Sequence, residues 1–288
     1  MLDTTKNCAP AAARLLAEGC HTVIRYYSRS DWKRVTQAEA HRLGSQGLRL
    51  AAVYQNRQTQ VADFDRNKGE AAGRHAYDYA QNTMFQPPGS AIYFSVDYDA
   101  TGSEITGAVI PYFEGVRQAF VTLSGGNPDY RVGVYGSGRT CRILADAGLV
   151  SLTWLAQARG WAEYDQYSAG NRWALRQGMP VVVAGIEGDP NDTNPAVPDF
   201  GAFLPEAATL GPIVEAAGAL PHLAGWTVNA RDGLRLRAGP GASFETRRVL
   251  PFGMALSLIS LSGDWALVDL NGDGAADGFC HSAFLKAA

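Results

Sequence analysis

The chain has 288 residues, of which 46% are hydrophobic and 18% are charged, and its formal net charge is −3. This balance is typical of a globular protein, and it excludes a fibrous or disordered chain and the basic footprint of a nucleic-acid-binding protein. No apolar run approaches the roughly 18 residues that a membrane span needs, so we expect no membrane insertion. The length favours one large domain and one small domain.

Short apolar runs alternate with segments of helical periodicity from residue 1 to about residue 190. We predict strands over 1–4, 23–26, 50–54, 91–96 and 132–135, and helices over 11–18, 36–46, 69–83, 104–123 and 139–147. A Thr-x-x-Glu capping box at Thr36 and Glu39 opens one of these helices. The alternation predicts parallel βαβ units.

The pattern changes after residue 150, where three further strands are predicted over 152–157, 173–177 and 181–186 with no helix between them. This arrangement fits an α/β fold of the modified TIM-like (β/α) barrel type, covering residues 1–205. An open doubly wound sheet is the alternative, but no Gly-x-Gly-x-x-Gly motif follows the first strand.

The C-terminal part of the chain has a different texture. Residues 206–224 are predicted to form a linker, with a helix-like patch at 205–218. From 225 to 288, Gly and Pro turns separate short alternating runs, which predicts a small all-β barrel. We predict its strands over 234–237, 248–250, 255–261, 265–270 and 278–281.

Cysteine spacing and one acidic loop bear on metals and cofactors. The four cysteines form no Cys-x-x-Cys pair, so we expect buried free thiols, with pairing of Cys8 and Cys20 left open. The loop 269–280 has oxygen-bearing side chains at positions 1, 3, 5 and 9 of a calcium-binding loop, namely Asp269, Asn271, Asp273 and Asp277. Position 12, where such loops have Glu, is Cys280. We therefore prefer to interpret this loop as a plain hairpin turn. We expect no cofactor.

Acidic residues follow the predicted barrel strands where active sites of such barrels lie. Asp3 ends the first strand, and Asp97 and Asp99 follow the fourth. Because residues two apart on a strand share a face, we expect Asp97 and Asp99 to face one pocket. Glu187 and Asp189 repeat this spacing at the last strand, and the sequence leaves open which of them joins the cluster. Capping and turn formation are the structural alternative for each carboxylate.

This pattern suits glycoside cleavage, which needs one protonated and one ionised carboxyl group. Like charges and partial burial raise one pKa and so create the proton donor. Arg25, Tyr26, Tyr54 and Tyr135 also lie at strand ends. We take them as candidates for substrate binding, since tyrosine rings stack on sugars and an arginine keeps a neighbouring carboxylate ionised. Packing is the alternative for the tyrosines.

Four segments together resemble the glycoside-hydrolase-like domain of unknown-function family 1906, over roughly residues 1–200. They are 2–5, 23–27, 93–99 and 131–136. That family is similar in fold to the family 25 lysozymes, which are N-acetylmuramidases on a modified α/β barrel.

The resemblance implies roles for the acidic residues. Asp3 matches the first-strand aspartate, and Asp97 and Asp99 match a pair whose second carboxyl is the general acid, although the lysozymes have Glu where this chain has Asp99. Asp189 and Asn191 match a last-strand Asp-x-Asn that lines the same pocket. Asp99 would therefore donate the proton, and the other aspartates would stabilise positive charge or position water or substrate.

Residues 229–241 and 265–268 resemble bacterial SH3-like domains, which hold wall hydrolases to peptidoglycan and so raise the effective substrate concentration. We therefore predict a monomeric, lysozyme-like N-acetylmuramidase that cleaves β-1,4 bonds of peptidoglycan without an essential metal. Hydrolysis of another polysaccharide and non-catalytic glycan binding are the alternatives. With no leader before the first strand, we expect export as a phage endolysin, by a secretion machine, or after loss of a leader.

Overall fold

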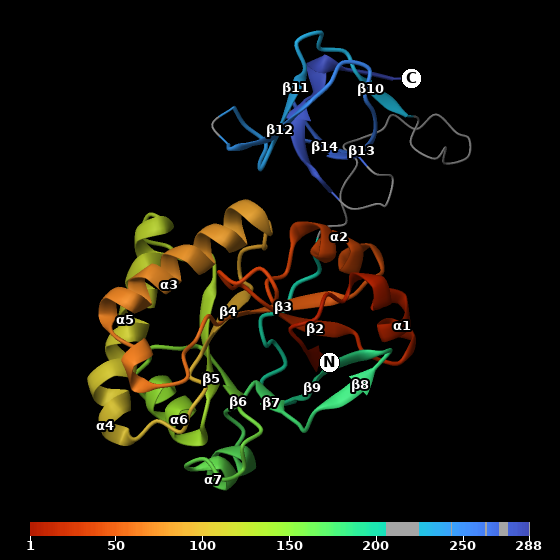
Figure 1. Ribbon diagram of the computed structural model, residues 1–288. Helices are drawn as coiled ribbons and strands as arrows, with labels where there is room; N and C mark the ends of the chain where they lie inside the picture. The colour runs from red at the N-terminus through yellow and green to blue at the C-terminus, as the bar shows by residue number, and fades with distance from the viewer. Residues whose placement is uncertain (206–224, 243, 263, 271–275, 288) are drawn as a thin grey trace. The chain divides into compact units, whose positions relative to one another are not determined.

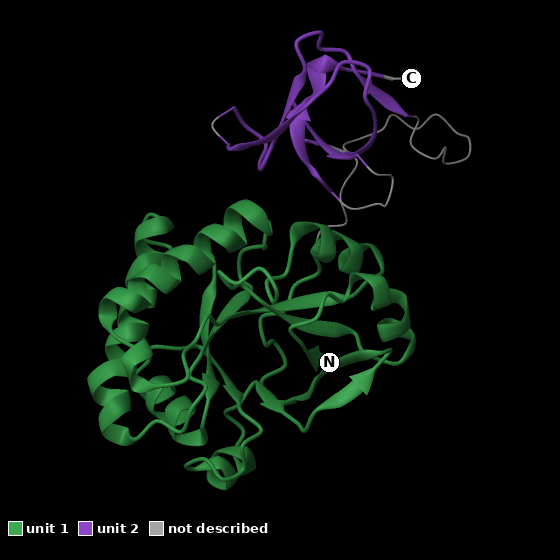
Figure 2. Cartoon of the chain, viewed as in Figure 1, with its two compact units in different colours: residues 1–207 green, residues 208–288 purple. Residues whose placement is uncertain are grey.

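The computed structural model describes residues 1–205, 225–242, 244–262, 264–270 and 276–287. The chain divides into two compact units, Met1–Ala207 and Ala208–Ala288 (Figure 2). The predicted linker and nearly all of the helix-like patch at 205–218 lie outside the described residues, as do Asn271 and Asp273 of the candidate calcium loop. Each unit is described by itself below.

Unit 1 is a closed barrel, in which β1 to β7 are parallel neighbours in sequence order and β9 is antiparallel to both β7 and β1. A short strand, β8, extends the sheet as a hairpin with β9. The strands are β1 (Leu2–Asp3), β2 (Thr22–Tyr26), β3 (Arg49–Tyr54), β4 (Ala91–Ser95), β5 (Arg131–Gly136), β6 (Leu152–Leu155), β7 (Leu175–Gln177), β8 (Val181–Val183) and β9 (Ile186–Thr193). The predicted modified barrel is confirmed, and the open doubly wound sheet is excluded because β9 closes the ring.

Helices lie outside the barrel strands (Figure 1). They are α1 (Ala12–Ala17), α2 (Gln37–Ser45), α3 (Arg66–Asp78), α4 (Gly102–Glu104), α5 (Ile110–Leu123), α6 (Gly138–Asp146) and α7 (Tyr164–Ala169). Thr36 caps α2 by accepting the Glu39 backbone N–H at 3.1 Å, which is one half of the predicted capping box. The other half does not form, because the Glu39 carboxylate accepts from Arg25 and from the Cys8 backbone instead. The short helix α7 was not expected, because the stretch between β6 and β7 has no clear helical periodicity.

Strand residues alternate between two hydrophobic layers, as the pleat of a strand requires. Ile24 and Val53 belong to the layer inside the barrel, together with Trp154. Their neighbours Val23 and Tyr54 belong to the layer between the strands and the helices. This alternation decides which strand-end side chains reach the mouth of the barrel.

Unit 2 is all-β, as predicted, and its neighbouring strands are antiparallel in the order β12-β11-β15-β14-β13-β10-β16. The strands are β10 (Trp226–Val228), β11 (Leu234–Arg237), β12 (Thr246–Leu250), β13 (Ala255–Ser262), β14 (Trp265–Asp269), β15 (Gly278–His281) and β16 (Leu285–Ala287). Two strands, β10 and β16, were not predicted from the sequence; each is three residues long, and they pair with each other.

Three further predictions concern cysteines, membranes and metals. The four cysteines are free and buried, which confirms the prediction of free thiols. No helix in the described part of the chain is long and apolar enough to span a membrane. The described residues contain no cluster of three metal-ligating side chains, and Asp277 of the candidate calcium loop accepts the Leu270 backbone N–H at 2.7 Å.

Candidate functional site

A polar cavity of about 210 Å³ opens at the C-terminal ends of the parallel barrel strands. It is lined by Asp3, Tyr26, Val53, Gln55, Ser95, Asp97, Tyr135, Trp154, Gln157, Gln177 and Asp189. This is the end at which α/β barrels carry their active sites. We call it the mouth pocket.

Asp3 and Asp189 form the most closely joined pair in the mouth pocket. They are opposite each other in the β1–β9 register. The side-chain amide of Gln177 donates to Oδ2 of both, at 3.0 Å for Asp3 and 3.2 Å for Asp189. The other oxygen of Asp3, Oδ1, is buried and accepts no hydrogen bond from the described residues. Asp3 therefore has one oxygen on which it can carry a proton.

Asp97 reaches the same pocket from the segment after β4. Its Oδ2 accepts a hydrogen bond from the Gln55 amide at 3.0 Å, and its backbone N–H donates to the Gln58 carbonyl at 2.8 Å. The Lys33 ammonium group lies 5.2 Å from the centre of the Tyr26 ring, beside the pocket. Its positive charge favours the ionised form of Asp97.

Burial raises the pKa of all three carboxyl groups. The pKa of Asp3 rises to about 7, first through burial and then through the charge of Asp189, while Tyr26, Gln177 and Arg25 act in the opposite direction. Burial also raises the pKa of Asp97, against the effects of Gln55 and Lys33, and that of Asp189, to which the charge of Asp97 contributes. Among the described residues, none of the three has a cationic partner within 4.0 Å. Of the three, Asp3 therefore has a pKa near neutral pH.

The structure does not bring Asp99 into the mouth pocket. Its side chain is exposed and accepts the Ala162 backbone N–H at 3.0 Å. The expectation that Asp97 and Asp99 share a face assumed that the strand continues through both. β4 ends at Ser95, so the chain has left the strand before Asp99 and the alternation no longer applies.

On β9, the structure places Asp189 in the pocket and Glu187 outside it. Glu187 is exposed on the part of β9 that pairs with β8, and its backbone carbonyl accepts the Thr4 hydroxyl at 2.6 Å. Asn191 is buried, and its Oδ1 accepts the indole N–H of Trp154 at 2.7 Å. Asn191 thus orients a pocket-lining ring instead of facing the pocket itself.

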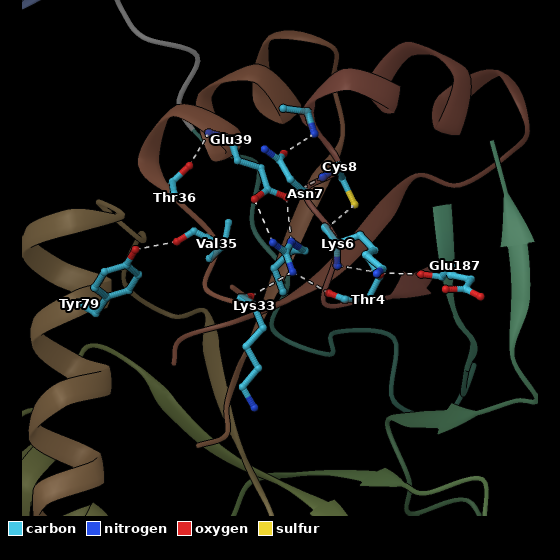
Figure 3. A network of polar contacts seen from close by, with 12 residues as sticks. Thr4, Lys6, Asn7, Cys8, Lys33, Val35, Thr36, Glu39, Tyr79 and Glu187 are labelled. Carbon is cyan, nitrogen blue, oxygen red and sulfur yellow. Dashed lines mark hydrogen bonds and ion pairs between the residues drawn. The ribbon is translucent and has the colours of Figure 1, made fainter. Parts of the chain in front are cut away.

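Arg25 lies on the outer face of β2, in a closed polar network. Two of its nitrogens donate to the Glu39 carboxylate at 2.8 and 3.0 Å, and another bonds the Thr4 carbonyl at 2.6 Å. Glu39 also accepts the Cys8 backbone N–H at 2.9 Å. In Figure 3 the Lys33 side chain runs away from Glu39. Arg25 is therefore a buried structural residue, which acts on the pocket only through its charge.

Of the predicted tyrosines, Tyr26 and Tyr135 line the mouth pocket, and Tyr54 is buried outside the barrel wall. Three glutamines that line the pocket, Gln55, Gln157 and Gln177, were not predicted as site residues. Gln177 ends a predicted strand, so the rule that selected the aspartates would also have selected it if neutral side chains had been considered.

Unit 2 has its own cavity, of about 430 Å³. Three aromatic rings stand along it, with Trp265 and His281 at 5.4 Å and His281 and Phe284 at 5.5 Å between ring centres. Arg235 and Arg237 also line it. Aromatic faces with flanking cations suit an extended ligand that carries both apolar and anionic groups.

Comparison with known proteins places both units. The model of the Rv2525c-like, glycoside hydrolase-like domain family matches residues 13–182, and the bacterial SH3 domain model matches residues 232–286. Two uncharacterized proteins of Bacillus subtilis (strain 168) are similar. YbfG is 32% identical over 134 residues, which are 46% of this chain and 18% of YbfG. FadG is 26% identical over 189 residues, which are 64% of this chain and 32% of FadG. The chain thus spans a third or less of the length of these relatives.

The fold is also that of a solved structure. The Tat-secreted protein Rv2525c of Mycobacterium tuberculosis, crystallised in complex with L-tartrate, superposes with a TM-score of 0.59 at 22% identity. The match covers 70% of this chain and 97% of that chain.

Proposed function

The chain belongs to the Rv2525c-like, glycoside hydrolase-like domain family and carries a bacterial SH3 domain, and on this premise we propose that its barrel hydrolyses a glycosidic bond of a cell-wall glycan. Both resemblances predicted from sequence motifs are confirmed. The observation that carries the proposal is the mouth pocket, where Asp3, Asp97 and Asp189 crowd together without a cationic partner among the described residues.

Glycoside cleavage requires a proton for the leaving oxygen and an ionised carboxylate near the sugar ring. Asp3 and Asp189 share one amide, and the raised pKa of Asp3 makes this pair the proton store. Asp97, beside Gln55 and near Lys33, is the carboxyl group whose ionised form is best supported. We assign proton donation to the Asp3–Asp189 pair. Asp97 would stabilise the positive charge that develops as the carbon–oxygen bond breaks.

The substrate we propose is peptidoglycan, cut at the β-1,4 bond after N-acetylmuramic acid. The similarity of the family to the family 25 lysozymes supports this bond. Tyr26 and Tyr135 offer aromatic surface in the pocket for sugar rings. The SH3 domain would hold the barrel at the wall through the cavity that contains Trp265 and His281.

The test measures reducing ends released from purified peptidoglycan by the wild type and by single variants. Asp3→Asn and Asp97→Asn are each expected to lower the rate at least about 100-fold. Asp99→Asn is expected to keep most of the activity, as is the control Asp165→Asn on the exposed surface of α7.

Other outcomes would change the assignment. Loss of activity in Asp99→Asn, with Asp3→Asn active, would return the proton donor to Asp99 as the family motif implies. If the new reducing ends lie on sugars other than muramic acid, the enzyme cleaves a different glycosidic bond from the one proposed. If the wild type binds the wall and releases nothing, the barrel is a glycan-binding domain without turnover.

A further inference from the structure

A second cavity, of about 290 Å³, lies outside the barrel wall beside the loops that follow β2 and β3. It is lined by Arg29, Tyr54, Asn56, Arg57, Gln58, Asp63, Lys68, Ala71 and Ala72. Two guanidinium groups, an ammonium group and a phenol make its chemistry mostly hydrogen-bond donating and positive. We call it the cationic cavity.

The two arginines of the cationic cavity are not neutralised. Within the described ranges, neither Arg29 nor Arg57 has a carboxylate within 4.0 Å, and both residues are exposed. Lys68, by contrast, pairs with Asp65 at 2.8 Å. The acidic lining residue, Asp63, accepts the Thr59 backbone N–H at 3.1 Å. The cavity therefore has positive charge available for an anion.

The loops around this cavity are fixed by Asn56. Its Oδ1 accepts the Ser28 hydroxyl at 3.0 Å and the Arg29 backbone N–H at 2.8 Å, and its Nδ2 donates to the Tyr54 hydroxyl at 2.8 Å. Gln58, at a left-handed φ of 56°, turns its buried amide back to accept the Asn56 backbone N–H at 2.7 Å. Strained backbone of this kind persists where its surroundings hold it in place. Because the Tyr54 oxygen accepts from Asn56, its own proton is free to donate.

The cationic cavity and the mouth pocket share one loop. Gln55 turns into the mouth pocket and bonds Asp97, while the next residue, Asn56, lines the cationic cavity. The Gln58 carbonyl accepts the Asp97 backbone N–H at 2.8 Å. The Lys33 ammonium group lies 3.5 Å from the Asn56 carbonyl oxygen. The mouth pocket and the cationic cavity are therefore lined by neighbouring residues of one loop, Gln55 and Asn56.

We propose that the cationic cavity binds a carboxylate carried by the glycan chain that occupies the mouth pocket, so that the barrel selects an anionic wall glycan over a neutral one. Guanidinium groups pair with carboxylates through two parallel hydrogen bonds, which gives geometric selection as well as affinity. The inference rests on the proposed glycan substrate and adds the group by which that substrate is recognised. The carboxylate comes either from a stem peptide or from the sugar itself.

The test measures binding by calorimetry in the full chain carrying Asp97→Asn, so that turnover is blocked. Three glycans of equal length are compared: wall glycan with stem peptides, the same glycan stripped of peptides, and a neutral chitin oligosaccharide. Adding Arg29→Ala and Arg57→Ala is expected to weaken binding of a carboxylate-bearing glycan about tenfold at low salt and less at 0.5 M salt, because salt screens exposed charges. Binding of the chitin oligosaccharide is expected not to change.

The matched control is Arg14→Ala with Arg42→Ala, which removes the same charge from exposed positions on α1 and α2. Loss confined to the peptide-bearing glycan supports a peptide carboxylate. Loss confined to the stripped glycan supports the carboxylate of the sugar, because the stem peptide is attached through an amide of that carboxyl group. Loss with both glycans means that the cavity accepts either carboxylate. Equal affinities of the Arg29/Arg57 variant and the control for all three glycans would overturn the proposal. So would undetectable binding of both carboxylate-bearing glycans.

The two proposals fail separately. If binding of carboxylate-bearing glycan depends on Arg29 and Arg57 but no reducing ends are released, the hydrolase proposal fails and the carboxylate site stands. If wall glycan is hydrolysed but replacing the two arginines does not change binding, the carboxylate site fails and the hydrolase proposal stands.

Discussion

Two groups of buried ionisable side chains lie on opposite faces of β1 and β2. Outside the barrel, the Arg25 and Glu39 side chains are each 2% exposed, and two hydrogen bonds join them. Inside, Asp3 is 3% exposed, and the groups beside its carboxyl are the neutral Gln177 amide and Tyr26 hydroxyl and the acidic Asp189. In the first group, an opposite charge offsets the free-energy cost of burying a charged side chain. In the second group, burial raises the pKa of Asp3, so that its carboxyl group stays neutral to a higher pH.

This difference separates structural from chemical use of buried charge. A neutralised pair with its hydrogen bonds made has nothing left to offer a ligand. A carboxyl group that lines a cavity and has a pKa of about 7 can give up its proton when the substrate needs it. The position of Arg25 at a strand end is the same as that of Tyr26, but only Tyr26 lines the cavity.

Removing one partner of the outer pair should have the largest effect on stability. Glu39→Gln leaves the Arg25 charge buried and unpaired, so the free energy of unfolding is expected to fall by about 3–5 kcal/mol. Urea denaturation of unit 1 measures the loss. The double variant Arg25→Met with Glu39→Leu should be closer to the wild type than Glu39→Gln. A loss below about 1 kcal/mol in the single variant would contradict the structural role.

Removing the inner charge should stabilise the protein, and only at high pH. The folded state holds the Asp3 proton up to a pKa of about 7, whereas the ordinary value is 3.8. Between these values the unfolded chain loses the proton and the folded chain keeps it, so stability falls as pH rises through this window. The free energy of unfolding of Asp3→Asn minus that of the wild type should therefore grow by about 1–4 kcal/mol from pH 4 to pH 8. A difference between the two proteins that is constant with pH would contradict the raised pKa.

Much of this site could be predicted from strand ends and strand alternation. The strand-end rule selected Asp3, Asp97 and Tyr135, which line the pocket. It also selected Arg25 and Tyr54, which do not. Each directly follows an inward-facing residue on its strand, Ile24 before Arg25 and Val53 before Tyr54, so each points outward. The alternation of side chains along β2 and β3 could therefore have excluded both. The prediction used the location of each residue at a strand end and not the face of the strand to which its side chain points.

The remaining differences depend on tertiary structure. Whether Asp99 faces the pocket depends on where β4 ends, and strand ends are poorly marked in a sequence that continues with Val96 and Tyr98. The position of Asp189 opposite Asp3 follows from the antiparallel direction of β9, which a sequence of strands without helices leaves open. The role of Gln177 requires both aspartates to be in place first.

Replacing Gln177 should shift the pKa of Asp3 without removing its carboxyl group. The Gln177 amide stabilises the ionised form of Asp3, so Gln177→Met should raise the pKa of Asp3 further. Since the proposed donor acts while protonated, the alkaline limb of the pH–rate profile should move up by roughly half to one pH unit. Gln157→Met is the control, because Gln157 lines the same pocket with no hydrogen bond to its carboxyl groups. A shift in the acidic limb instead would exclude Asp3 as the donor.

An exposed ion pair provides the smallest expected effect. Arg176 and Asp192 are 2.8 Å apart, the same distance as in the Arg25–Glu39 pair, but their side chains are 35% and 67% exposed. Asp192→Asn should change the free energy of unfolding by less than about 0.5 kcal/mol, and still less at high salt. Asp192 is the partner to change, because Arg176 also packs on the Trp173 ring at 4.8 Å, and losing that contact would confuse the result.

The measurement is urea denaturation of Asp192→Asn and Glu39→Gln under the same conditions. Both variants remove one carboxylate from an ion pair of the same length and replace it with the amide of similar shape. If exposure controls the outcome, the two losses should differ several-fold, since water solvates the arginine left behind at Arg176 and cannot reach the one at Arg25. Equal losses would mean that contact distance, not burial, sets the value of these pairs. The division between the outer and inner groups of β1 and β2 would then have no energetic basis.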